Sequence, residues 1–300
     1  MTKADTMRLL RPAPNVLGFY DGRIDGLRLH GPQPNWLDDG GFTLGTCSYA
    51  IVSGAEALVY DTHMSLDHAR WIRSALEAEG VREIRVILSH HHLDHIAGNA
   101  VFEDCEIIAN AATAAAMEAG LDDARTTDPP IDPVVMPTTV CDRETVVTVG
   151  GVQVALMSFD IHSHDGLCLW LLDSRTLFAG DTLEDTCTYV AEPGRLEIHL
   201  QDLARMAELD IAAILPNHGA EARIAAGGYG SGLIGATEAY IRRLLACRDD
   251  PVLAATPLKD VVAEECAAGD VIYHPAYETV HTRNVEAVLS TQSGRQEAGR

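Results

Sequence analysis

Positively charged residues are scarce in this 300-residue chain. It has 22 Lys and Arg residues against 44 Asp and Glu residues, and its formal net charge is −22 at pH 7. Affinity for nucleic acid comes largely from Lys and Arg side chains that neutralise phosphates. The same charges draw proteins to anionic membrane surfaces. We therefore expect neither a nucleic-acid partner nor a membrane partner.

Long apolar runs are also missing. No segment reaches the roughly 18 apolar residues expected of a membrane-spanning helix. Residues 1–11 include basic side chains but lack the apolar stretch that a secretory signal peptide needs. The seven cysteines are scattered and form no C-x-x-C pair, which does not indicate a disulfide framework and fits a reducing compartment. Together these absences predict a cytoplasmic protein.

What the chain does contain is a dense cluster of histidines. Residues 89–95 hold four imidazoles and one carboxylate directly after the apolar run 86–88. Neutral imidazole and carboxylate are the usual ligands of zinc and similar divalent metals. Without such a role, each buried polar ring would need its own hydrogen-bond partner. The alternatives are a solvated loop and a histidine-rich metal-scavenging tract, although such tracts are usually long and compositionally biased.

Four further polar residues follow short apolar runs in the same manner. They are Asp61, His162, Asp181 and His218. Apolar runs of this length indicate buried strands, and the turns after them place the polar residues at strand ends. A single strand-end Asp or His is more often structural. Five such sites in sequence, counting the histidine cluster, indicate one joint site.

The alternation of elements predicts the architecture. Ser65 is a plausible N-cap of a helix that runs through Glu79 and ends at Gly80. Hairpins mixed with strand-helix units indicate two sheets packed face to face with helices outside. We expect residues 30–45 and 122–139 to form loops. Trp36 lies in the first of these, and we expect it to plug the sheet rather than to face a substrate.

The order of the motifs resembles the metallo-β-lactamase superfamily. The second motif of that family, His-x-His-x-Asp-His, corresponds to His90, His92, Asp94 and His95. Asp61 corresponds to the first motif, and His162, Asp181 and His218 correspond to the third, fourth and fifth. The resemblance covers residues 47–218, and the segment 177–183 (LFAGDTL) is most similar to the glyoxalase II and lactonase branch.

Two residues distinguish the chain from other branches of that superfamily. True β-lactamases typically lack a bridging aspartate at the fourth motif, where this chain has Asp181. The related flavodiiron oxidoreductases carry a glutamate where this chain has His92. Two alternatives to a small-metabolite hydrolase stay open. They are an oxidoreductase resembling the persulfide dioxygenases, with a single iron, and a β-lactamase.

The resemblance implies an α+β fold, a four-layer αββα sandwich with C-terminal helices. Residues 1–225 would form the metallo-β-lactamase-like domain, and residues 226–300 a helical extension packed on it. The resemblance also implies two divalent metal ions, with zinc as the first choice and iron or manganese as alternatives. His90, His92 and His162 would hold one ion. Asp94, His95 and His218 would hold the other, and Asp181 would bridge them.

The implied activity is hydrolysis of a thioester, lactone or ester of a small metabolite by a hydroxide that bridges the metals. Asp94 would be the catalytic residue that carries a proton to the leaving group. Asp61 would orient a ligand imidazole, with a turn or cap aspartate as the equal alternative. His281, Tyr277 and His164 are candidate substrate contacts, with structural or bystander roles as their alternatives. The expected partner is a small-molecule substrate, and a homodimer is left open.

Overall fold

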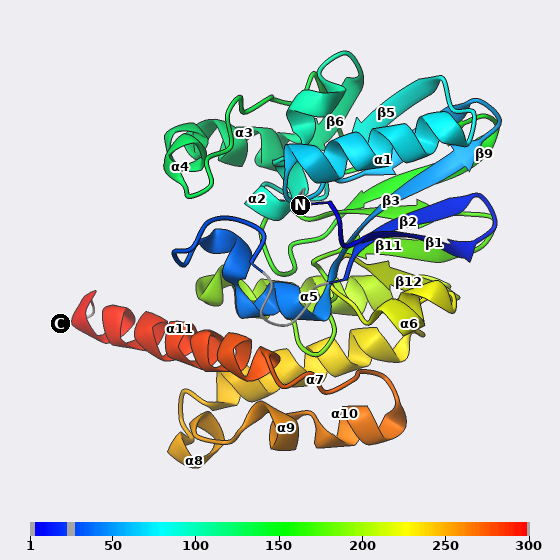
Figure 1. Ribbon diagram of the computed structural model, residues 1–300. Coiled ribbons are helices and arrows are strands. Elements are labelled where there is room, and N and C mark those ends of the chain that lie inside the picture. The colour runs from blue at the N-terminus through cyan, green and yellow to red at the C-terminus, as the bar shows by residue number, and fades with distance from the viewer. Residues whose placement is uncertain (1–3, 23–27, 299–300) are drawn as a thin grey trace.

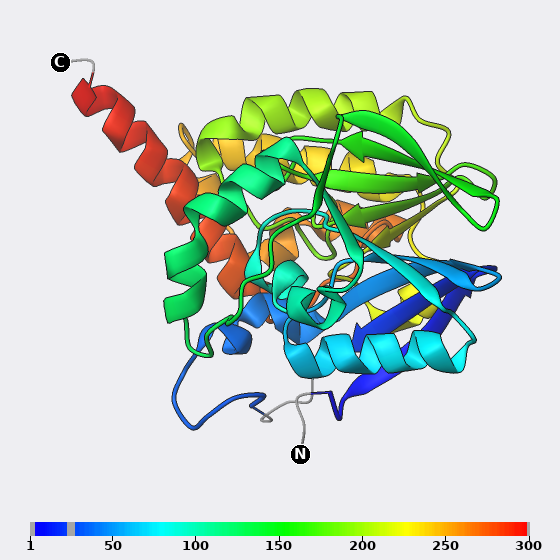
Figure 2. The ribbon, with the colours of Figure 1, turned by 90° about the horizontal axis from the view of Figure 1, so that it is seen from above.

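The computed structural model describes residues 4–22 and 28–298, and it shows two β-sheets packed face to face between helices (Figure 1). Helix α1 (Leu66–Ala78) covers the outer face of one sheet. Helix α5 (Leu196–Ala207) covers the outer face of the other (Figure 2). This arrangement confirms the predicted α+β class and the αββα sandwich.

The first sheet has seven strands in the order β1 to β7. Strands β1 to β4 pair antiparallel, whereas β4 to β7 pair parallel. Parallel neighbours end at the same edge of a sheet, so the segments that follow β4 and β5 lie side by side. The strands are β1 (Met7–Ala13), β2 (Val16–Asp21), β3 (Thr46–Ser53), β4 (Glu56–Tyr60), β5 (Glu83–Ile87), β6 (Glu106–Asn110) and β7 (Thr139–Cys141).

The second sheet has five strands in the order β12-β11-β10-β9-β8. Strands β11 and β12 pair parallel, and the other neighbours pair antiparallel. The carboxyl ends of β11 and β12 therefore also share an edge. The strands are β8 (Glu144–Val149), β9 (Val152–Ser158), β10 (Leu167–Leu171), β11 (Thr176–Gly180) and β12 (Ala213–Pro216).

Helix α1 illustrates why these segments fold as they do. Ser65 accepts a hydrogen bond from the backbone N–H of His68 and so caps the helix, as predicted. Ala69, Ile72 and Leu76 recur at helical spacing and are buried against the first sheet. The remaining helices are α2 (Leu93–Ile96), α3 (Ala111–Ala119), α4 (Leu121–Thr126), α6 (Glu221–Ala225), α7 (Gly232–Ala246), α8 (Pro251–Ala254), α9 (Leu258–Val261), α10 (Ala263–Ala268) and α11 (Tyr277–Ala298).

The two predicted loops contain short helices, so both predictions were partly wrong. In the first loop, residues 36–38 and 40–44 form 3-10 turns. The second loop begins inside α4, whose first turn carries Asp122 and Asp123, where the helix dipole favours acidic side chains. Ala124 in α4 is buried, and its carbonyl accepts a hydrogen bond from the backbone N–H of Ile131. This local packing stabilises a helix that the polar sequence did not indicate.

The C-terminal helices share a hydrophobic core with the second sheet. One cluster of buried side chains includes Phe178 on β11, Leu203 on α5, Tyr240 on α7 and Val288 on α11. The division after residue 225 stays a prediction. Within the described ranges, no helix combines the length and the apolar character that crossing a membrane requires.

Candidate metal centre

Seven His and Asp side chains meet at the edge of the sandwich where β5, β11 and β12 end. They come from the segments after these strands, from α2, and from the turn after β9. In the part of the chain that is described, they form two groups of potential metal ligands that share Asp181. The first group is His90, His92, His162 and Asp181, and the second is Asp94, His95, His218 and Asp181.

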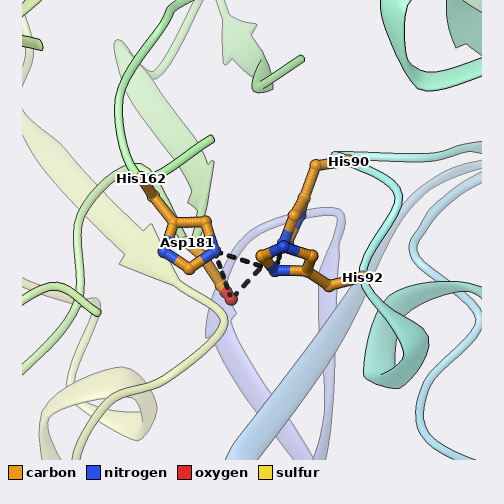
Figure 3. A group of neighbouring side chains, drawn as sticks. All are labelled: His90, His92, His162 and Asp181. Atoms are coloured by element: carbon orange, nitrogen blue, oxygen red, sulfur yellow. Dashed lines mark hydrogen bonds and ion pairs between the residues drawn. The ribbon is translucent and has the colours of Figure 1, made fainter. Parts of the chain in front are cut away.

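The first group converges on a common centre (Figure 3). Nδ1 of His92 lies 2.9 Å from Nε2 of His90 and 3.0 Å from Nε2 of His162. Oδ2 of Asp181 lies 3.6 Å and 3.7 Å from the same Nε2 atoms. Ligand atoms about 2.0–2.1 Å from a tetrahedral zinc ion lie roughly 3.4 Å from one another. The spacing and the chemistry of these four side chains therefore fit a divalent ion.

The second group has a similar spacing but more carboxylates. Oδ2 of Asp94 lies 3.2 Å from Nε2 of His95 and 3.2 Å from Nε2 of His218. Oδ2 of Asp181 lies 3.1 Å and 3.4 Å from those two nitrogens. Oδ1 of Asp181 is buried and has no hydrogen-bond partner. A buried oxygen without a partner calls for a further ligand, and an ion between the groups would provide it.

The two groups differ in the pKa of their imidazoles. Burial and the neighbouring imidazoles lower the pKa of His90 well below its usual value and that of His92 to about 3. Burial also acts to lower the pKa of His95 and His218, but the carboxylates of Asp181 and Asp94 outweigh it and raise both values. Burial also acts to lower the pKa of His162, but the hydrogen bond to Glu184 and the carboxylate of Asp181 outweigh it and raise the value. In the first group, therefore, only His90 and His92 present neutral nitrogens. In the second group a metal ion must displace protons to bind.

Carboxylates and carbonyls outside the two groups orient the ligand rings. Nδ1 of His95 lies 2.8 Å from Oδ2 of Asp61, and the other oxygen of Asp61 accepts a hydrogen bond from the backbone N–H of Ser89 at 2.7 Å. On the other side, Nδ1 of His162 lies 2.8 Å from the carbonyl of Tyr189 and 3.3 Å from Oε1 of Glu184. Such contacts leave each Nε2 free for a metal. Asp61 thus lies beside a ligand imidazole, where the resemblance placed it.

Three supporting residues were missed at the level of sequence. Glu184 lies against His162, and Asn217 donates to Asp61 at 2.6 Å. Asp165 accepts hydrogen bonds from the backbone N–H and the ring of His91, at 2.9 Å and 3.1 Å, and so holds the histidine segment in place. Each of the three lies within three residues of a motif residue in the chain. That proximity is the only signal the sequence offers for them.

A cavity of about 540 Å³ opens above the two groups. Trp36 lines it, so our expectation that this residue plugs the sheet was wrong. Nε1 of Trp36 donates to the carbonyl of Pro129 at 2.9 Å, which holds the indole at the cavity. The lining also includes five of the seven predicted ligands, namely His92, Asp94, His162, Asp181 and His218.

The three candidate substrate contacts are not among the described residues that line the cavity. The ring of His281 lies 2.9 Å from the hydroxyl of Tyr240 and 3.1 Å from the carbonyl of Thr256. Tyr277 donates to the carbonyl of Gly41 at 3.1 Å. His164 pairs with Glu192 at 2.6 Å. All three side chains are engaged elsewhere, and α11 reaches the cavity through Val280 instead.

Comparison with known proteins identifies relatives of one family. The sequence model of the metallo-β-lactamase superfamily matches residues 43–218. A Caenorhabditis elegans protein named beta-lactamase-like protein 2 homolog is 26% identical over 193 residues, which is 63% of this chain and 59% of that protein. A Gallus gallus protein named acyl-coenzyme A thioesterase MBLAC2 is 29% identical over 126 residues, 36% of this chain and 45% of that protein. The chain thus covers less than two thirds of either relative.

Solved structures show the same fold. VMB-1 superposes with a TM-score of 0.58 at 16% identity, covering 79% of this chain and 96% of that one. A metallo-beta-lactamase from Pontibacter korlensis superposes with a TM-score of 0.55 at 12% identity, covering 76% of this chain and 99% of that one. The family match extends over more than half of the chain and contains all five motifs. The chain therefore belongs to the metallo-β-lactamase superfamily and has its fold.

Proposed function

We propose that this chain is a dinuclear metal-dependent hydrolase that cleaves a thioester, lactone or ester of a small metabolite. The observation that carries the proposal is the pair of ligand groups that share Asp181. Each group contains at least two imidazoles and at least one carboxylate, the donor set that zinc prefers, with iron and manganese as alternatives. The cavity directly above the groups gives a substrate access to them.

The side chains around the cavity suit hydrolysis of an activated carbonyl. Two divalent ions would supply a water molecule that is deprotonated near neutral pH. Asp181, shared by both groups, holds their positions relative to each other. Asp94 belongs to the second group and also lines the cavity, so it is placed to carry a proton to the leaving group. Nδ1 of His95 lies 2.8 Å from Asp61, a contact that orients Nε2 of the ring toward the centre.

The relatives support a hydrolase more than the alternatives. The avian relative is named an acyl-coenzyme A thioesterase, and thioester cleavage is within the proposed chemistry. The likeness to β-lactamase structures is at 12–16% identity and concerns the fold. A single-iron oxidoreductase would use the first group and leave the carboxylate-rich second group without a role. The single-iron oxidoreductase is therefore one of the outcomes that the metal analysis below can distinguish.

The test combines metal quantification with a panel of thioesters, lactones, esters and β-lactams. We expect two ions per chain and hydrolysis of a thioester, lactone or ester. A matched pair of variants checks the ligand assignment. His90→Ala should lose about one ion per chain, whereas His91→Ala, in the same histidine run but in neither group, should keep both. One iron per chain with oxygen uptake and no hydrolysis would contradict the proposal.

A further inference from the structure

The described side chains that line the cavity above the metal centre provide no permanent positive charge. None of the described residues that line it has a Lys or Arg side chain. Beyond the two ligand carboxylates, its lining includes three further acidic residues, Asp39, Asp123 and Glu184. Asp39 is paired with Arg283, and Glu184 contacts His162, whereas Asp123 is exposed on α4. Among the described lining residues, a bound substrate therefore meets carboxylates and imidazoles but no Lys or Arg side chain.

The walls of the cavity are mainly apolar. The lining includes Leu93 on α2, Met117 on α3 and Val134. It also includes Trp36 and Phe42, whose rings pack edge to face at 6.2 Å between centroids. Cavities of this size with apolar walls and a few polar groups at the base commonly enclose an apolar part of a small molecule. Here the polar groups at the base are the metal ligands, which fixes where a reactive carbonyl would lie.

Phosphate groups would be poorly accommodated at this cavity. Proteins recognise phosphates mainly through Arg and Lys side chains and helix N-termini. The first turn of α4 borders the cavity, but it carries Asp122 and Asp123, and these carboxylates oppose an anion there. The net charge of −22 adds a long-range repulsion of polyanions.

We propose that the cavity takes the apolar acyl group of an uncharged or cationic thioester or ester and discriminates against leaving groups that carry several phosphates. The inference rests on the proposed hydrolase function for its chemistry, but it concerns which substrates enter the cavity. It predicts a substrate other than the acyl-coenzyme A that appears in the name of the avian relative. A coenzyme A thioester has the right acyl chemistry and the wrong charge for this cavity.

The first experiment compares one acyl chain on two thiols that differ in phosphate. Octanoyl-pantetheine is uncharged, whereas octanoyl-coenzyme A carries the same thioester on a polyanion. We expect kcat/KM to be at least about tenfold higher for the pantetheine thioester, equivalent to about 1.4 kcal/mol. Equal or higher kcat/KM for the coenzyme A thioester would overturn the inference and leave the hydrolase proposal intact.

A binding experiment separates failure of the inference from failure of the proposed function. The non-hydrolysable octyl thioethers of pantetheine and coenzyme A are titrated into the metal-loaded protein by calorimetry. We expect the pantetheine thioether to bind at least tenfold more tightly. If it does while no thioester or ester is hydrolysed, the hydrolase proposal fails and the charge selectivity stands. Equal binding of the two thioethers, or binding of neither, overturns the inference.

Two matched variants on α4 test whether charge in the cavity sets the preference. Asp123→Lys places a cation in the cavity lining. Asp122→Lys changes the net charge by the same amount at a neighbouring side chain that is 99% exposed and does not line the cavity. We expect Asp123→Lys to reduce the preference for the pantetheine thioester several-fold and Asp122→Lys to leave it nearly unchanged. If the ratio of kcat/KM for the two thioesters were the same in both variants, the charge at Asp123 would not set the preference.

A second matched pair on α3 tests where the acyl chain lies. Ala116 lines the cavity and is half-buried, whereas its neighbour Ala115 is exposed and does not line it. Ala116→Phe should shorten the longest acyl chain that the enzyme hydrolyses efficiently. Ala115→Phe should not change the chain-length profile. If both variants keep the wild-type profile, the acyl chain does not occupy this cavity.

Discussion

The two ligand groups around Asp181 resemble each other in spacing and differ in charge. The first combines three imidazoles with the shared carboxylate, whereas the second combines two imidazoles with two carboxylates. A third carboxylate, Asp61, also lies 2.8 Å from His95 in the second group. One half of the centre is therefore built mainly from imidazole nitrogens, two of which, those of His90 and His92, have a lowered pKa. The other half is built mainly from ion pairs that a metal ion must replace.

This difference suits the proposed pair of metal ions. Carboxylates in the second group would offset the positive charge of an ion there, and the shared Asp181 would reduce the repulsion between two ions. The imidazole-rich first group adds no further negative charge to the cavity. The comparison predicts that a change at Asp181 affects both groups, whereas a change at any other ligand affects mainly one.

Asp181→Asn should produce the largest effect. The amide keeps the size of the side chain but removes the charge between the groups, so we expect kcat to fall by more than about 100-fold. The side chain is nearly isosteric, and therefore the thermal unfolding temperature of the variant should stay close to that of the wild type. A variant that fails to fold while the other ligand variants do fold would make Asp181 mainly structural.

Single ligand changes should separate the two groups. His162→Ala removes a donor from the first group only, and His95→Ala removes one from the second group only. Each variant should retain about one metal ion per chain, measured by elemental analysis after dialysis. If His95→Ala kept the full wild-type metal content, the second group would be assigned incorrectly.

Substitutions of residues that contact the candidate ligands should have smaller effects, and each substitution should affect one group. Asp61→Asn weakens the support of His95, and Glu184→Gln weakens that of His162. Asn tolerates the left-handed backbone conformation that Asp61 adopts, with φ at 67°. We expect each change to lower metal affinity or activity by about 10- to 100-fold. Competition with a chromophoric chelator would measure the metal affinity. If either variant lost metal from both groups, the division of the centre into two groups would be contradicted.

A buried carboxyl outside both groups provides the smallest effect. Burial raises the pKa of Asp185 from 3.8 to about 6, although it accepts hydrogen bonds from the backbone N–H of Ile272 and the hydroxyl of Tyr229. Because the folded state binds this proton more tightly than the unfolded chain does, the carboxyl stabilises the fold at acidic pH. That contribution is lost as the pH rises through about 6.

Asp185→Asn removes this titration and keeps an acceptor for Ile272. Relative to the wild type, the variant should therefore gain about 1 kcal/mol of unfolding free energy between pH 5 and pH 8. Chemical denaturation at the two pH values measures the change. If the variant instead lost stability relative to the wild type between pH 5 and pH 8, groups other than Ile272 and Tyr229 would stabilise the charged form of Asp185.

The sequence was sufficient for the two-sheet architecture and for the capped start of helix α1, whereas the metal ligands that it indicates stay a prediction. Helix α1 begins after Ser65 as predicted, because a capping side chain there precedes apolar residues at helical spacing. Strand β1 (Met7–Ala13) was not predicted. It is an edge strand with exposed Arg8 and Arg11 and with Pro12, so its apolar pattern is weak.

The cavity could not be predicted because it depends on contacts between distant segments. Trp36 reaches its position through a hydrogen bond to Pro129, 93 residues away. Asp165 holds His91 across 74 residues. No local spacing records such contacts, whereas the motif residues can be recognised because each lies in a segment that follows a strand, after a short apolar run. The sequence thus indicates the candidate metal ligands more directly than it indicates the walls of the cavity.

The most direct test of the central claim is a crystal structure of the zinc-loaded protein with anomalous scattering measured at the zinc edge. The account predicts two anomalous peaks per chain about 3.5–4 Å apart, with the carboxylate of Asp181 in contact with both. One peak should lie among His90, His92 and His162, and the other among Asp94, His95 and His218. A single fully occupied peak in crystals grown with excess zinc, or a second peak that does not touch Asp181, would contradict it.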